Sequence, residues 1–268
     1  MRIISWNELV GGELGREPAP SAMTVGVFDG VHRGHQELVR RVRETDGSLV
    51  PTAVTFADNP KRVTAPERFS GMLQTLEQKL ETLEGYGIRL CILIDFSGNF
   101  SKLGGKEFVS TLVKSGGARF FAIGSDFKCG HKLSTDAEGV RSIAASLGAE
   151  VDIVDPVLVE GDKVSSSLIR SVLREGRTDR AFAMLGRPYT LDLRVFDKEV
   201  SESVLNLLPR QRGYVLPRAG SYSVRYSAGS VAEEFIATVK DGSITLGGVS
   251  DTRPGGFLEF HSTLGYTE

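Results

Sequence analysis

The sequence predicts an α/β protein in which a parallel sheet, covered by helices on both faces, is followed by a small antiparallel β domain. Between residues 22 and 156, short apolar runs alternate with helical patterns, as in repeated strand–helix–strand units. Beyond residue 188 the helical patterns stop, and apolar and polar residues alternate instead. The length of 268 residues suits about two domains. We place the boundary between residues 1–186 and 187–268.

Five runs of mostly β-branched or aromatic residues, bounded by Gly, Asp or Pro, predict the strands of the parallel sheet. They are Ala22–Phe28, Leu49–Phe56, Ile88–Asp95, Arg119–Gly124 and Glu150–Asp155. Helices are predicted between them at Gly34–Glu44, Leu73–Leu83, Gly105–Lys114 and Asp136–Leu147. In the second helix Leu73, Leu76, Leu80 and Leu83 recur at intervals of three and four, which predicts one apolar face. Two further helices are predicted after Ser165 and at Thr178–Leu185.

The C-terminal 80 residues predict strands at the runs LDLRVF, GYVLP, SYSVRY, EEFIATVK, SITLGG and GFLEFH. Asp241-Gly242 separates two of these runs, and this dipeptide is typical of a two-residue hairpin turn. Strands of this length and spacing favour a small barrel or sandwich.

Composition excludes several classes of protein. Lys and Arg number 32 against 34 Asp and Glu, so the net charge of −2 argues against a dedicated nucleic-acid binder. Cys91 and Cys129 are the only cysteines, too few for a disulfide scaffold or a cysteine-based zinc site. No signal peptide and no apolar run of about 18 residues is visible. We therefore expect a soluble, cytoplasmic protein without a membrane or nucleic-acid partner.

The strongest chemical signal is the run TVGVFDGVHRGH at Thr24–His35, where the first predicted strand ends and the first helix begins. Gly26 and Gly30 would let a nucleotide approach the backbone closely, because they have no Cβ. His32 and His35 would project from one face of the first helical turn and add two imidazoles to the positive end of the helix dipole. This arrangement suits a phosphate that gains negative charge in a transition state.

The histidines also fit two less specific interpretations, as ordinary surface residues or as metal ligands. A metal site normally needs three protein ligands, and the other histidines, His131 and His261, lie in no matching motif. The position at the end of the first strand favours phosphate binding.

The second signal is VSSSLIR at Val164–Arg170. Its three hydroxyls precede a helix and offer donors to a phosphate, and Arg170 could fork onto phosphate oxygens. On its own the run is more typical of an ordinary helix cap, since Ser-rich caps with a nearby Arg are common. Two Gly- or Pro-containing loops after predicted strands, GSDFKCG at residues 124–130 and TFADNP at residues 55–60, read by themselves as turns.

Together these segments resemble the bacterial bifunctional riboflavin kinase/FAD synthetase family. GVFDGVHRGH looks like its adenylyltransferase signature, and VSSSLIR, GSDFKCG and TFADNP are similar to three further motifs in the same order. LGRPY at residues 185–189 is similar to the junction between the two modules of the family. The likeness covers residues 20–190.

The resemblance implies a Rossmann-like nucleotidyltransferase of the HxGH type that joins FMN and ATP, with Mg²⁺, to give FAD and pyrophosphate. It implies catalytic roles for His32, His35 and Arg170. Nucleotide binding would fall to Gly26, Phe28, Asp29, Gly30, Ser165, Ser166 and Ser167, and flavin binding to Asn59, Asp126 and Phe127. The protein ligands of the metal stay unknown.

The chain departs from the family pattern in places. Ser167 stands where the family has Thr, Asn59 replaces a His, Asp58 a Pro and Cys129 an aromatic residue. The larger departure is C-terminal, because residues 187–268 contain no Gly-Phe-Pro-Thr-Ala-Asn motif, and the charged, leucine-bearing stretch 197–211 stands in its place. Residues 216–225 and 258–261 nevertheless look like strands of the kinase module. We expect a shortened riboflavin-kinase-like module without kinase activity.

The leading hypothesis is therefore an enzyme, an FMN adenylyltransferase with ATP and FMN as substrates. The alternatives are a bifunctional enzyme that also phosphorylates riboflavin, a nucleotidyltransferase for another acceptor, and a flavin-binding protein without catalysis. The histidines and Arg170 count against a pure binder, which gains little from groups that stabilise a transition state.

Overall fold

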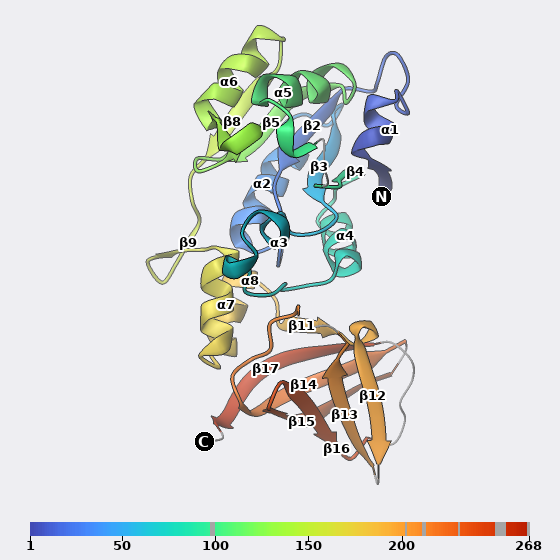
Figure 1. Ribbon diagram of the computed structural model, residues 1–268, viewed down its shortest axis with the longest axis vertical. Helices are drawn as coiled ribbons and strands as arrows, with labels where there is room; N and C mark the ends of the chain where they lie inside the picture. The colour runs from blue at the N-terminus through green and yellow to red at the C-terminus, as the bar shows by residue number, and fades with distance from the viewer. Residues whose placement is uncertain (97–99, 202, 211–212, 230, 250–255, 267–268) are drawn as a thin grey trace. The chain divides into compact units, whose positions relative to one another are not determined.

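The computed structural model describes residues 1–96, 100–201, 203–210, 213–229, 231–249 and 256–266 (Figure 1). The chain forms two compact units. The first unit contains residues 1–67 and 79–158, and the second contains residues 68–78 and 159–268. Residues 68–78 thus belong to the second unit although they lie within the sequence of the first.

The first unit is built on a six-stranded sheet in which all the strands are parallel. The spatial order is β1-β4-β3-β2-β5-β8. The strands are β1 (Arg2–Ser5), β2 (Ser21–Val25), β3 (Val50–Phe56), β4 (Leu90–Ile94), β5 (Ala118–Gly124) and β8 (Glu150–Val154). The five predicted strands are confirmed to within three residues at each end, whereas β1 was not predicted.

Helices cover both faces of this sheet (Figure 1). They are α1 (Trp6–Val10), α2 (Arg33–Glu44), α4 (Leu76–Gly85), α5 (Gly105–Lys114) and α6 (Ala137–Ser146), whereas α3 (Lys61–Thr64) is a single turn without buried residues. Short 3₁₀ turns are η1 (Pro66–Arg68), η2 (Phe100–Lys102) and η3 (His131–Leu133), and β6 (Lys128–Cys129) pairs with β7 (Thr135–Asp136). The predicted α/β class with a parallel sheet is confirmed.

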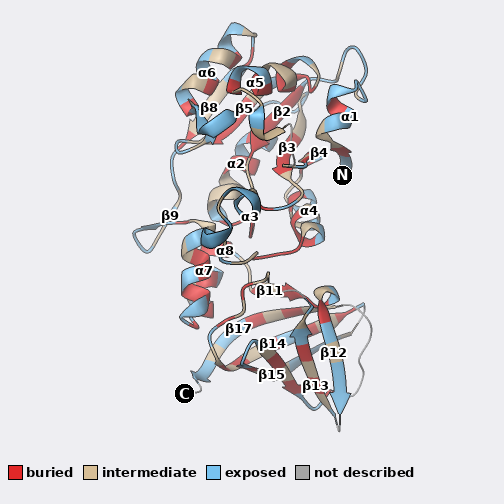
Figure 2. Cartoon of the chain, in the orientation of Figure 1, coloured by how far each residue is buried: buried red, intermediate tan, exposed pale blue. Residues whose placement is uncertain are grey.

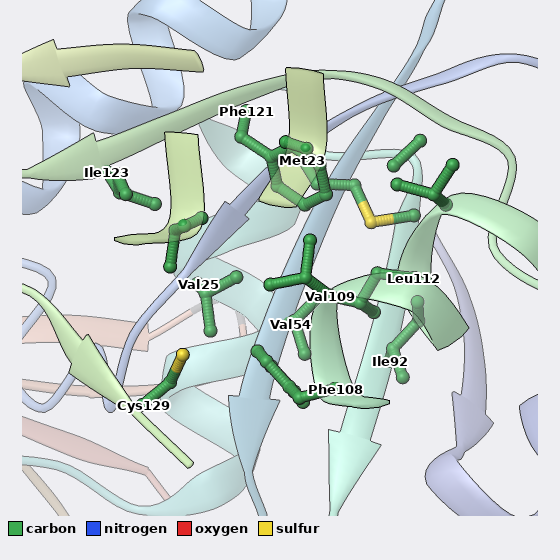
Figure 3. Packing of buried hydrophobic residues seen from close by; sticks show 14 of the residues in the cluster. Met23, Val25, Val54, Ile92, Phe108, Val109, Leu112, Phe121, Ile123 and Cys129 are labelled. Atoms are coloured by element: carbon green, nitrogen blue, oxygen red, sulfur yellow. The ribbon is translucent and has the colours of Figure 1, made fainter. Parts of the chain in front are cut away.

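The inner strands β2, β3 and β4 are mostly buried on both faces, as in other parallel sheets, whereas the edge strands β1 and β8 are partly exposed (Figure 2). On one face, Met23 and Val25 of β2 lie in a cluster with Phe108 and Leu112 of α5 (Figure 3). On the other face the sheet presents small residues, such as Ala22, to α2. The apolar side chains therefore alternate between two layers and fix β2 at the centre of the unit.

The second unit contains α7 (Ser166–Arg174), α8 (Thr178–Leu185) and a curled antiparallel sheet (Figure 1). The seven strands are ordered β11-β17-β14-β15-β16-β13-β12. They are β11 (Tyr189–Asp192), β12 (Phe196–Ser201), β13 (Val204–Pro209), β14 (Gly220–Ala228), β15 (Val231–Lys240), β16 (Ser243–Gly247) and β17 (Phe257–Tyr266). A 3₁₀ turn, η4 (Leu193–Val195), follows β11. A separate two-stranded ribbon of β9 (Leu158–Val159) and β10 (Asp162–Lys163) precedes α7. The small antiparallel domain is confirmed.

The structure tests several C-terminal predictions. The hairpin at Asp241-Gly242 is confirmed: both residues have positive φ, +50° and +77°, and Lys240 pairs with Ser243. The strand predicted at GYVLP is wrong, because the N–H of Val215 bonds to the carbonyl of Met72 rather than to the sheet. The hairpin of β12 and β13 was not predicted. Of the stretch 197–211, residues 202 and 211 lie outside the described residues.

Residues 68–78 are held in the second unit by polar contacts. The Thr75 hydroxyl donates to the buried Asp192 carboxylate at 3.0 Å, and the Gln78 amide donates to the Thr190 carbonyl at 3.2 Å. Helices α7 and α8 are also grouped with this unit, since α8 packs against β11 and β17. The boundary at residue 186 stays a prediction for the extent of the catalytic domain.

None of the helices in the described ranges is long and apolar enough to cross a membrane.

Candidate active site

The topology of the first unit places the predicted histidine loop at the switch point of the sheet. From β2 the order of strands runs outward in both directions, with β3 on one side and β5 on the other. Loops that leave the carboxyl ends of two such strands diverge, and this crevice is where open α/β sheets bind ligands. The loop after β2 carries His32 and His35, and the loop after β5 carries Asp126.

The loop between β2 and α2 has a strained backbone. Phe28, Gly30 and Val31 have φ of +52°, +85° and +36°, and the left-handed region is most unfavourable for a β-branched residue such as Val31. A Cβ at Gly26 would lie 3.2 Å from the ring of Phe28, which is fully buried. Gly26 is therefore explained by packing of the loop on itself, whereas Gly30 meets the need for positive φ.

The two histidines stack on each other at the start of α2. His32 is the N-cap residue, and within the described chain its side chain makes no capping hydrogen bond. The ring of His35 lies 3.7 Å from that of His32, centroid to centroid, and 5.0 Å from the ring of Phe28, edge on. The prediction that both imidazoles share one face of the first turn is confirmed. A helix N-terminus without a capping side chain favours an anion.

The surroundings of His35 determine the charge state of its imidazole, which the sequence did not predict. Burial lowers the pKa of His35 well below its ordinary value, and the charges of His32 and Lys79 lower it further. The ring is therefore neutral at neutral pH. Its buried Nδ1 atom has no hydrogen-bond partner among the described residues. A buried ring nitrogen of this kind fits a ligand that supplies the missing partner.

The sequence interpretation missed Lys79, which the structure adds to this site. Its side chain is buried in α4, and its Nζ donates to the carbonyls of Phe56 at 2.6 Å and Val27 at 3.3 Å. Burial lowers the pKa of Lys79 to about 8, although the nearby Asp29 carboxylate opposes this shift. A signal was present, because Lys79 lies three residues after Leu76 and four before Leu83, on the predicted apolar face.

The predicted apolar face of α4 is only partly right. Leu83 is fully buried, but Leu76 and Leu80 are only partly buried, whereas the polar Gln78 and Lys79 are buried.

Asn59, predicted to lie near the flavin, is buried in the turn after β3. Its side-chain oxygen accepts from the N–H of Lys61 at 3.0 Å, and the Asp58 carboxylate accepts from the N–H of Asn59 at 2.7 Å. Asp58 also pairs with Arg62 at 2.9 Å. The two departures from the family pattern therefore stabilise their own turn and the start of α3, and a contact of Asn59 with flavin stays a prediction.

The loop after β5 combines turn-forming and exposed residues. A Cβ at Gly130, where φ is +78°, would lie 2.5 Å from the backbone N of Gly105, so this glycine permits a close approach to α5. Cys129 is buried in the core, and burial raises the pKa of its thiol to about 11. Asp126 is exposed and Phe127 is half-buried against the core. Their predicted flavin contacts are not tested by this geometry.

The Ser-rich motif lies in the second unit. Ser165 is the N-cap of α7, and its hydroxyl accepts from the N–H of Leu168 at 3.2 Å. Ser166 is half-buried, and Ser167 is exposed. The buried Arg170 donates from Nε to the carbonyl of Gly71 at 2.6 Å. The capping interpretation is confirmed for Ser165, and phosphate binding by this cluster stays a prediction.

No group of three or more His, Cys, Asp or Glu residues within the described ranges is arranged to hold a metal ion.

The family model for FAD synthetase matches residues 15–168, more than half of the chain. The chain belongs to the FAD synthetase family. The match includes both histidines, the loops after β3 and β5, and the Ser-rich motif up to Leu168. It confirms the resemblance seen in the motifs.

The chain is similar to proteins described as bifunctional riboflavin kinase/FMN adenylyltransferase, among them those of two bacteria. That of Pseudomonas fluorescens is 32% identical over 175 residues, which cover 64% of this chain and 56% of the relative. That of Listeria monocytogenes is 28% identical over 214 residues, which cover 76% and 67%. The chain thus spans less than two thirds of the length of the first relative.

A crystal structure described as a macrolide-efflux protein from Streptococcus pneumoniae has the same fold. The TM-score is 0.85, and the match covers 100% of this chain and 92% of that one. At 24% sequence identity the likeness concerns the fold alone.

Proposed function

We propose that the protein is an FMN adenylyltransferase, which transfers the adenylyl group of ATP to FMN and gives FAD and pyrophosphate. The observation that carries this proposal is the stacked pair His32 and His35 at the start of α2. Membership of the FAD synthetase family identifies FMN as the acceptor that fits best.

The reaction needs positioning and charge stabilisation rather than a covalent intermediate. A phosphate oxygen of FMN attacks the α-phosphorus of ATP in line, a new P–O bond forms, and the bond to pyrophosphate breaks. The attacking phosphate is already ionised, so no general base is required. The site must instead align the two phosphates and stabilise the charge that builds on the α-phosphoryl oxygens.

The first helical turn of α2 is suited to this task. Its backbone N–H groups and dipole favour a negative charge. The neutral ring of His35 can donate one N–H to a phosphoryl oxygen without first losing or gaining a proton. In a buried site such a bond strengthens as the oxygen gains charge.

The triphosphate contacts of Ser165, Ser166, Ser167 and Arg170 are part of the proposal. The guanidinium of Arg170 is buried and fixed by Gly71, so its orientation is set before a ligand binds. We expect Mg²⁺ to arrive on the ATP phosphates, because Mg²⁺ in such sites is commonly held by substrate phosphates with one or two carboxylates.

We also propose that the second unit does not phosphorylate riboflavin. Phosphoryl transfer depends almost entirely on holding Mg-ATP in place. Residues 189–268 contain no equivalent of the Thr- and Asn-bearing kinase motif of the family. Strands β12 and β13 occupy most of residues 197–211, the stretch that stands in place of this motif.

The test is product formation by the purified full-length chain. With FMN, ATP and Mg²⁺ we expect FAD and pyrophosphate, measured by chromatography and by the fluorescence difference between FMN and FAD. A parallel reaction with riboflavin in place of FMN should give no FMN.

The controls separate the alternatives. Nicotinamide mononucleotide and phosphopantetheine replace FMN as acceptors, and a product with either one but none with FMN would refute the proposed substrate. Binding of FMN without turnover would favour a carrier. Steady formation of FMN from riboflavin would refute the absence of kinase activity.

A further inference from the structure

Lys79 is a buried cation in a helix to which the sequence motifs assign no chemistry. Its exposed fraction is 3%. Burial of an ammonium group costs free energy unless the surroundings supply hydrogen bonds and opposite charge. A lysine kept at such a position has to be explained by what it contacts.

The contacts of Lys79 join the ends of two neighbouring strands. Its Nζ donates to the carbonyl of Phe56, the last residue of β3, and to that of Val27, which lies just past the end of β2. The hydroxyl of Thr55 donates to the same Val27 carbonyl at 3.1 Å, and the N–H of Gly26 donates to the Val54 carbonyl at 3.1 Å. Lys79 thus completes a set of hydrogen bonds that fixes where the chain leaves β2.

We propose that Lys79 is a positioning residue of the adenylyl-transfer site, which holds the loop after β2, and with it His32 and His35, in the geometry that turnover needs. This proposal rests on the proposed function, because the turnover in question is adenylyl transfer to FMN. Lys79 acts through the loop and the histidines and is not placed against the substrate.

The strained backbone of the loop explains why a hydrogen bond from Lys79 to the Val27 carbonyl is needed. Phe28 and Val31, both with positive φ, follow the anchored Val27 within four residues. Unfavourable backbone conformations persist only where the surrounding structure holds them. Without the ammonium at the carbonyl of Val27, the loop can relax toward ordinary φ values. A shift of about 1 Å in a catalytic group can reduce turnover by roughly 100-fold.

Lys79 also acts on His35 through its charge. The groups that face Lys79 are the carboxylates of Asp29 and Asp58 and the thiol of Cys91. His35 is influenced by burial first, then by His32 and by Lys79. The positive charge of Lys79 therefore helps to keep His35 neutral, and its removal should raise the pKa of His35.

The kinetic test compares Lys79→Met and Lys79→Gln with Lys114→Met. Lys114, an exposed residue at the end of α5, is a matched control for the loss of one positive charge in the same unit. We expect kcat for FAD formation to fall by about 10- to 100-fold in both Lys79 variants, with smaller changes in the KM for FMN. Lys79→Gln, which retains a donor, should keep more activity than Lys79→Met. A kcat within twofold of wild type in a folded Lys79→Met protein would overturn the proposal.

The second test needs no substrate and no turnover. The ring protons of His35 are followed by NMR during a pH titration and are assigned by their loss in His35→Gln. In the wild type the signals should shift a second time near pH 8, where Lys79 loses its proton. In Lys79→Met this second step should vanish and the midpoint of the His35 titration should rise. Absence of a step near pH 8 in the wild type would overturn the coupling even if the variants do not fold.

The two tests separate this proposal from the proposed function. A wild-type protein that makes no FAD would contradict the proposed function, whereas the NMR titration would still decide whether Lys79 acts on His35. A wild-type protein that makes FAD, with an equally active Lys79→Met variant, would contradict the role of Lys79 alone.

Discussion

Raising the pH from 8 to 10 should stabilise the wild-type first unit relative to a Lys79→Met variant. The pKa of Lys79 is about 8 in the folded protein and 10.5 for an unperturbed lysine. Between these values the unfolded chain binds the proton more fully than the folded protein does, so the contribution of Lys79 to stability rises with pH. From pH 8 to 10 the rise amounts to about 2 kcal/mol.

Two thiols change stability in the opposite direction. Burial raises the pKa of Cys91 to about 12 and that of Cys129 to about 11, from an ordinary value of 9.0. The contribution of each thiol to the free energy of unfolding is fully present below pH 9 and falls above it, by about 1.3 kcal/mol for each thiol at pH 10. The wild type alone should therefore show a flat or falling profile. The difference between wild type and variant removes most of the contribution of the thiols.

Trp6 makes the measurement specific for the first unit. It is the only tryptophan and packs 5.2 Å from the ring of Phe100 and 5.4 Å from that of Phe108. Urea unfolding followed by its fluorescence at pH 8, 9 and 10 gives the free energy of unfolding for both proteins. A difference between wild type and variant that does not change with pH would refute the assignment of a depressed pKa to Lys79.

The remaining predictions concern the reaction and the second unit. His32→Ala and His35→Ala should each lower kcat by about 10²–10³ with nearly unchanged FMN affinity, measured by flavin fluorescence; a double variant with near-normal turnover would exclude their role. Arg170→Lys should raise the KM for ATP more than that for FMN in steady-state kinetics, because lysine keeps the charge but loses the planar fork. A chain that ends at Tyr189 should lose solubility or thermal stability, because residues 68–78 lose Asp192 as a partner. It should keep FAD synthesis per folded molecule. Loss of synthesis in a well-folded truncation would give the second unit a share in catalysis.

Local patterns predict most of the fold. Five parallel strands and their helices follow from periodicity and punctuation, and the Asp241-Gly242 turn follows from two residues that tolerate positive φ. The strand Arg2–Ser5 was missed because four residues, two of them exposed, carry almost no periodic signal. The GYVLP run was misread because its pairing partner, Met72, lies more than 140 residues earlier.

The candidate site shows the same limit of local patterns. His32 and His35 can be recognised because their spacing and the strand before them fix their positions. The neutral state of His35 and the role of Lys79 depend on burial and on atoms from three elements, which no short window contains. The sequence predicts a guanidinium that can bind phosphate at Arg170, but not the bond from its Nε to the carbonyl of Gly71, 99 residues earlier in the chain.

The assembly of the second unit from two separate pieces of chain has a consequence for synthesis. Residues 68–78 are made early, but Gly213 and Val215, whose backbones pair with Met72, are made roughly 140 residues after it. At translation rates of about 5–20 residues per second, this delay is on the order of 7–30 s. Strands β4, β5 and β8, which complete the parallel sheet begun by β1, β2 and β3, are made during that time, while Met72 still lacks its backbone partners Gly213 and Val215. Protease accessibility of this segment in nascent chains therefore reports whether synthesis has passed residue 215.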